Sequence, residues 1–94
     1  MKSIIQSEKE CYITGSKVGL HEHHIFFGYG QRKKSEKYGL KVFLRAELHN
    51  LSDKGVHSNK ALDLELKRKA QKIAMKHYKW TKEDFIRIFG RNYI

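Results

Sequence analysis

Four neighbouring residues near the start of the chain can bind a metal ion or move a proton: His21, Glu22, His23 and His24. Two more histidines, His49 and His57, follow, so that five of the six histidines fall between positions 21 and 57. Imidazole is the commonest metal ligand in proteins and titrates near neutral pH. The cluster therefore predicts a metal site, a proton-transfer site or both.

These residues need an element that holds them in place, and the pattern of residues 20–27 predicts a strand. The apolar run from Ile25 to Phe27 follows the histidines, and glycines at 28 and 30 end the segment. Side chains alternate between the faces of a strand, so His23 and His24 are expected to point in opposite directions. The alternation does not say which ring binds metal. A pair of adjacent histidines is also typical of a hydrated surface strand, but the apolar run favours rings held rigidly.

The rest of the pattern predicts a second strand and two helices. Residues 31–37 are expected to be a basic loop, residues 40–44 a strand with Lys41 on its open face, and residues 46–50 one helical turn. Apolar residues at helical spacing predict a long helix over 60–77 that starts at Ser58 or Asn59. Thr81 and Asp84 resemble a capping box that begins a short helix ending at residue 90. Residues 1–10 are expected to be an edge strand or a loose arm. The fold class is therefore α+β.

The composition limits the choice of partner. The chain has 94 residues and a formal net charge of +10, which predicts one small domain over residues 1–94 that binds a polyanion. Nucleic acid is favoured over a membrane surface, because the apolar faces of the predicted elements are expected to pack into a core. No apolar run approaches transmembrane length. A basic protein without such a partner is the alternative. The single cysteine, Cys11, excludes an intrachain disulfide, and the short polar start does not look like a signal peptide, so a reducing cytoplasm is expected.

The order of several segments resembles the small HNH nucleases of bacteriophages and prophages. The resemblance covers residues 11–94 and depends on the ordered set Cys11-Tyr-Ile-Thr14-Gly15, Glu22-His23-His24-Ile25-Phe26-Phe27-Gly28, Arg32-Lys-Lys-Ser35-Glu-Lys-Tyr38-Gly39-Leu40, Glu47-Leu-His49-Asn50, Gly55-Val56-His57 and Phe85-Ile-Arg-Ile-Phe89-Gly90-Arg91-Asn92-Tyr93. It implies a ββα-metal (His-Me finger, treble-clef-like) core, in which two strands, a loop and a helix surround one divalent ion. The long helix and the short final helix would follow.

The resemblance also implies roles for individual residues. His24 matches the general base that activates water, and His23, His49 and His57 match the metal ligands. Imidazole ligands suit zinc, nickel, cobalt or manganese better than magnesium, which prefers oxygen. Magnesium remains an alternative if fewer histidines bind the ion. Many relatives hold a structural zinc with two Cys-x-x-Cys knuckles. Only Cys11 of those four cysteines is present, so no structural zinc is expected and Cys11 is predicted to be a small core residue.

These observations predict a metal-dependent endonuclease that hydrolyses phosphodiester bonds in DNA, inside the cytoplasm of a bacterial host. Arg32 is expected to clamp the phosphate during catalysis, because a guanidinium forks onto phosphate oxygens. Lys33, Lys34 and Lys37 are expected to make diffuse contacts with the nucleic-acid backbone, together with Arg32. Two alternatives remain: a non-catalytic basic nucleic-acid-binding module of phage recombination or packaging, and a metal-stabilised structural protein with no polyanion partner.

Overall fold

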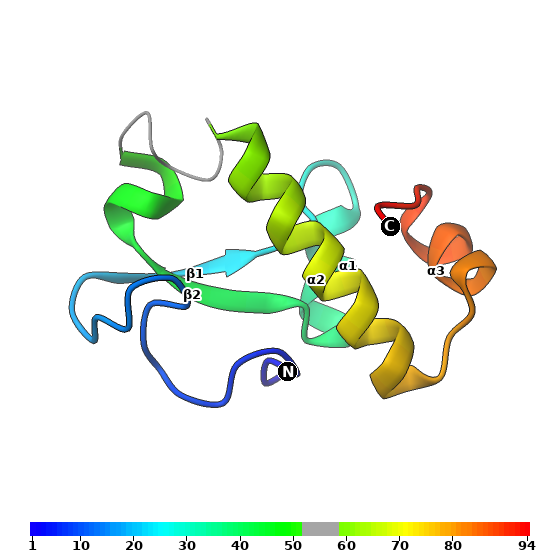
Figure 1. Ribbon diagram of the computed structural model, residues 1–94, viewed down its shortest axis with the longest axis horizontal. Coiled ribbons are helices and arrows are strands. Elements are labelled where there is room, and N and C mark those ends of the chain that lie inside the picture. The colour runs from blue at the N-terminus through cyan, green and yellow to red at the C-terminus, as the bar shows by residue number, and fades with distance from the viewer. Residues whose placement is uncertain (52–58) are drawn as a thin grey trace.

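The computed structural model (Figure 1) describes residues 1–51 and 59–94. Its elements follow in the order β1 (Leu20–His24), α1 (Gln31–Tyr38), β2 (Lys41–Arg45), the short π-helix η1 (Glu47–Leu51), α2 (Lys60–Tyr78) and α3 (Lys82–Phe89). The strands form a two-stranded antiparallel sheet, which confirms the α+β class. Predicted metal ligand His57 lies outside the described residues.

The sheet is shorter than the sequence predicts at the end of its first strand. Its register places His24 opposite Lys41 and His23 opposite Val42. One further backbone bond follows, from the Ile25 N–H to the Leu40 oxygen (3.0 Å). The Phe26 N–H then donates to the Ser35 hydroxyl instead of to β2 (3.0 Å), so the ladder ends here and not at residue 27.

The basic segment after β1 is helix α1, so the prediction of a loop over residues 31–37 is wrong. The helix carries only one buried side chain, that of Ser35, and therefore shows no apolar periodicity in the sequence. Glycines in the left-handed region bound it, Gly30 at φ 76° and Gly39 at φ 71°. A Cβ atom at Gly39 would lie 2.6 Å from the Lys2 carbonyl oxygen, so this close approach also requires glycine.

The two later helices begin where the sequence predicts. The Asn59 side chain accepts a hydrogen bond from the Leu62 N–H at the start of α2. Thr81 and Asp84 form the predicted capping box of α3, and Gly90 ends that helix. The predicted turn over 46–50 corresponds to η1. Among the described helices, none is both long and apolar enough to cross a membrane.

The hydrophobic core joins the sheet to the helices. In Figure 1, α2 crosses the two strands, and α3 lies beside its C-terminal half. Val42 and Leu44 of β2 share one buried cluster with side chains of α2 and with Phe26 and the two phenylalanines of α3. The α2 members are Leu66, Ala70 and Ala74, the α3 members are Phe85 and Phe89, and Cys11, Ile25 and Leu40 complete the cluster. Cys11 is 1% exposed, and its sulfur accepts hydrogen bonds from the N–H groups of Thr14 and Arg45, so its prediction as a core residue is confirmed.

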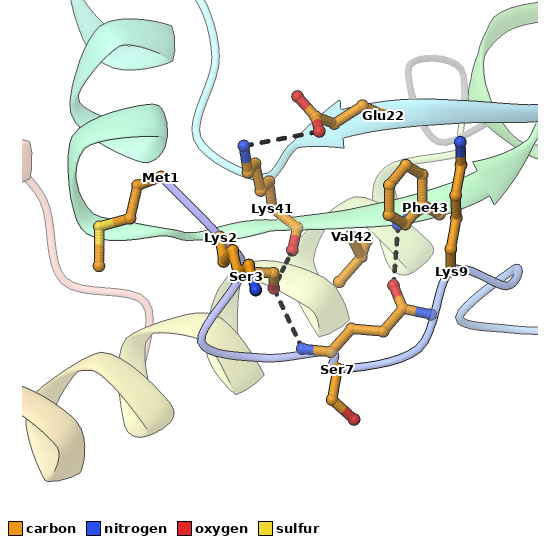
Figure 2. A pocket seen from close by; sticks show the side chains of 10 residues that line it. Met1, Lys2, Ser3, Ser7, Lys9, Glu22, Lys41, Val42 and Phe43 are labelled. Atoms are coloured by element: carbon orange, nitrogen blue, oxygen red, sulfur yellow. Dashed lines mark hydrogen bonds and ion pairs between the residues drawn. The ribbon is translucent and has the colours of Figure 1, made fainter.

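Residues 1–10 are neither a strand nor a loose arm. They run beside β2 and are attached to its backbone by side-chain hydrogen bonds (Figure 2). The Ser3 hydroxyl donates to the Lys41 oxygen, and the Phe43 N–H donates to Gln6 Oε1 (2.9 Å). The segment therefore lies along the edge of β2 that faces away from β1.

Candidate functional site

β1 presents two sets of ionisable side chains, because its residues alternate between the faces of the sheet. His21 and His23 lie on the face towards η1, where both rings contact His49. The Nδ1 atoms of His21 and His49 are 3.2 Å apart, and the ring centres of His23 and His49 are 5.1 Å apart. His23 is fully buried. We call these three residues the imidazole cluster.

The opposite face carries a network of two carboxylates, one imidazole and one ammonium group. His24 Nε2 lies 2.8 Å from Oε1 of Glu36 on α1 and 3.7 Å from Glu22 Oε1. Lys41 Nζ lies 2.9 Å from Glu36 Oε2 and 3.5 Å from Glu22 Oε2. Lys41 is therefore nearly buried between these groups, and the prediction that it lies on the open face is wrong.

The charge of Glu36 decides which ring nitrogen of His24 carries a proton. The α-amino group of Met1, the His24 imidazole and the Lys41 ammonium hold the pKa of the Glu36 carboxyl well below its usual range. An ionised carboxylate only accepts hydrogen bonds, so His24 Nε2 must be the donor in this pair. In the neutral ring, the lone pair that can accept a proton is then on Nδ1.

A pocket of about 230 Å³ is lined by residues of both sets at this end of β1. Its lining contains three predicted site histidines and the predicted phosphate clamp. The six lining residues are Glu22, His23, His24, Phe27, Arg32 and His49. The fold thus brings together a general-base candidate, two metal-ligand candidates and a guanidinium that are spread over 27 positions of the sequence.

The basic residues of α1 divide into two groups. Arg32 and Lys33 line a neighbouring pocket of about 490 Å³, together with Glu22, His24, Gly30 and Glu36. Lys34 instead donates to the Ile88 oxygen on α3 (2.6 Å), and Lys37 lies over the Tyr38 ring (5.3 Å). Of the four residues predicted to contact nucleic acid, Arg32 and Lys33 therefore lie nearest to His24.

Two groups of side chains can be compared as places for a metal ion. Glu22, His24 and Glu36 offer three ligand atoms that lie within 4.8 Å of one another and could hold a metal. However, the Lys41 ammonium already lies against both carboxylates and would compete with a cation. His23 and His49 line the 230 Å³ pocket with their ring centres 5.1 Å apart, and paired imidazoles suit zinc, nickel or manganese. The donor chemistry therefore fits an ion on the imidazole side.

Glu36 is the residue of this site that the sequence interpretation missed. It lies on a segment predicted to be a loop, twelve positions after His24. One signal was present, because Glu36 is the only acidic residue between positions 23 and 46, inside a basic run.

Comparison with known proteins does not add to this geometry: no family model, no curated protein and no solved structure matches the chain. The resemblance to HNH nucleases therefore stays a prediction based on the ordered segments quoted above.

Proposed function

We propose that the chain is a metal-dependent endonuclease that hydrolyses phosphodiester bonds of DNA. The observation that carries this proposal is the 230 Å³ pocket, where His24 and Arg32 meet His23 and His49. The order β1, β2, α2 is compatible with a ββα-metal core in which α1 is inserted between the strands. The HNH-like segments of the sequence give independent support.

His24 is the proposed general base. The Glu36 carboxylate holds one side of the ring by a charge-assisted hydrogen bond, so the imidazole is fixed in orientation and tautomer. A neutral imidazole can remove a proton from water near pH 7, and the adjacent carboxylate stabilises the imidazolium that results. Glu36 is thus a positioning residue for His24.

His23 and His49, together with His57, would hold one divalent ion. Such an ion supplies positive charge to the scissile phosphate and to the leaving oxygen when it is bound. Arg32 lines both pockets that His24 lines, so its guanidinium can bind the non-bridging phosphate oxygens beside the base. The net charge of +10 draws a polyanion to this surface, largely through its phosphates.

Nicking of supercoiled plasmid DNA tests the proposal. We expect cutting with manganese or nickel, no cutting in EDTA, and a rate about 100- to 10,000-fold lower for His24→Ala. Arg32→Ala should also slow cutting, and Arg32→Lys should restore it only in part because an ammonium cannot fork onto phosphate. His77→Ala is the matched control, because His77 is an exposed histidine on α2 that lines none of these pockets.

The alternative of a basic module without catalysis predicts a different result. In that case the wild type and His24→Ala would bind DNA equally, and neither would cut it with any divalent metal. Cutting that survives His24→Ala at the wild-type rate would also overturn the proposal, because the base would then be another group.

A further inference from the structure

A second cavity, lined in part by Glu22 and Lys41, lies next to the proposed active site, and the proposed hydrolysis does not use it. It measures about 690 Å³, within the range of small-molecule and nucleotide sites. Figure 2 shows it between the N-terminal segment and β2, with Lys9 and Phe43 on one side and Ser3 and Lys41 on the other. Its walls thus combine an aromatic ring with basic and hydroxyl side chains.

Phe43 is an aromatic side chain that the fold itself does not use. It is partly buried, yet in the part of the chain that the structure describes it belongs neither to the hydrophobic core nor to the apolar residues packed against that core. Its backbone is fixed on both sides, since its N–H donates to Gln6 Oε1 and its oxygen accepts from the Tyr12 N–H (2.8 Å). The strand therefore holds the Phe43 backbone in place at the wall of the cavity, where its ring can act as a platform.

The charge around this platform suits a phosphate. Lys9 Nζ lies 5.7 Å from the centre of the Phe43 ring, and Lys2 lines the same cavity. Neither lysine makes an ion pair with a carboxylate of the described residues, whereas Lys41 is neutralised by Glu22 and Glu36. The long stem of Lys9 lets its ammonium move to a phosphate while a base takes its place over the ring.

The cavity shares a wall residue with the pockets that His24 lines. Glu22 lines all three of them, and it lies directly opposite Phe43 in the β1–β2 register. His24 is two residues further along β1, about 7 Å away along the strand. A nucleotide chain with one phosphate beside Arg32 and His24 can therefore place a neighbouring nucleotide in this cavity.

We infer that this cavity is a subsite for an unpaired nucleotide whose base stacks on Phe43 and whose phosphate binds Lys2 and Lys9. A base inside a duplex has both faces covered, so it cannot lie on a protein ring without leaving the stack. The preferred substrate is therefore single-stranded nucleic acid or a duplex with a single-stranded extension. The inference rests on the proposed function at one point only. That function is what makes the adjacent phosphate the one that is cleaved.

Fluorescence of the adenine analogue 2-aminopurine tests the subsite without any cutting. The wild-type protein is titrated in EDTA with a single strand that carries the analogue, with the matching blunt duplex and with a duplex that has a single-stranded extension. We expect quenching and tighter binding for the single strand and the extension. Phe43→Leu should abolish the quenching and weaken single-strand binding about tenfold, with duplex binding unchanged.

Three further measurements keep the inference falsifiable. Phe43→Tyr keeps a ring and should keep the wild-type affinity, and Lys9→Ala should weaken binding more than Lys82→Ala, which removes the same charge from exposed α3 outside the cavity. Equal affinities of wild type and a folded Phe43→Leu for the single strand would overturn the inference. Binding of the free 2-aminopurine nucleotide as tightly as the strand would also overturn it, in favour of a mononucleotide site.

The result of the fluorescence titration does not depend on whether the protein cuts DNA. If the wild type shows quenching that depends on Phe43 but never cuts DNA with any metal, the subsite stands and the endonuclease proposal fails. If it cuts DNA through His24 but shows no preference for unpaired nucleotides, the endonuclease proposal stands and the subsite fails.

Discussion

Ser35 and Phe26 are joined by two hydrogen bonds that tie α1 to the end of β1. The Ser35 hydroxyl accepts from the Phe26 N–H at 3.0 Å and donates to the Phe26 oxygen at 2.7 Å, and both residues are buried. This one hydroxyl therefore satisfies both backbone groups of a core residue where the sheet ladder stops.

Ser35→Ala should destabilise the protein by about 1–3 kcal/mol, because it leaves the buried N–H and oxygen of Phe26 without their partner. Urea unfolding monitored by circular dichroism measures the change. Ser7→Ala, at an exposed serine, is the control and should stay within about 0.5 kcal/mol of the wild type. A Ser35→Ala variant as stable as the control would mean that water or a shifted backbone replaces the hydroxyl.

The hydrogen bonds between Ser35 and Phe26 explain why parts of the fold could be predicted from the sequence and α1 could not. The starts of α2 and α3 are local signals, since Asn59 and Thr81 bond to residues three positions on. The alternation of His23 and His24 is also local. Helix α1 depends on distant partners instead, through Ser35 to Phe26 and through Lys34 to the Ile88 oxygen. No periodicity within the helix records those contacts.

The candidate site also has parts that could be predicted from the sequence and parts that could not. The histidines could be found by residue type, because imidazoles gathered in one region require a chemical reason. Their grouping could not be found in full, because His49 reaches His21 and His23 only through the turn of η1 after β2. Glu36 reaches His24 only because residues 31–38 form a helix. A segment predicted to be a loop gives no reason to direct its carboxylate at β1.

Glu36→Gln tests whether this carboxylate positions His24. The amide keeps the shape of the side chain but loses the charge that orients the imidazole and stabilises its protonated form. We expect kcat for DNA cutting to fall about 10- to 100-fold with little change in KM, as for other groups that orient a functional histidine. Glu65→Gln, which removes an exposed carboxylate from α2, should leave both constants unchanged. A fall in stability that accounts for the lost activity would contradict the positioning role.

The same carboxylate should make stability depend on pH. Folding lowers the pKa of Glu36, so its ionised form is favoured in the folded protein, mainly by the Met1 amino group and then by His24 and Lys41. The stabilisation is fully present above the ordinary carboxyl pKa and is lost as the pH falls through the lower, folded value. The difference in free energy of unfolding between wild type and Glu36→Gln should therefore shrink from about pH 6 to about pH 3. A difference that stays constant or grows over this range would show that the charge contributes nothing.

Metal binding should show whether an ion binds at the imidazole cluster or at the group formed by Glu22, His24 and Glu36. We expect zinc or nickel at saturating concentration to raise the melting temperature of the wild type by about 10 °C or more, because an ion that binds only the folded state stabilises it. His23→Ala and His49→Ala should each remove most of this rise, since each deletes an imidazole from the shared pocket.

Glu22→Gln is the decisive comparison, because Glu22 belongs to the group of three possible ligand atoms that lie within 4.8 Å of one another among the described residues. The Lys41 ammonium lies 3.5 Å from Glu22 and 2.9 Å from Glu36, so a cation there would have to displace an ammonium that already pairs with both carboxylates. We therefore expect Glu22→Gln to keep the metal-induced rise. If it loses the rise while His23→Ala keeps it, the ion binds with Glu22, His24 and Glu36, and His24 is then a metal ligand and not the base.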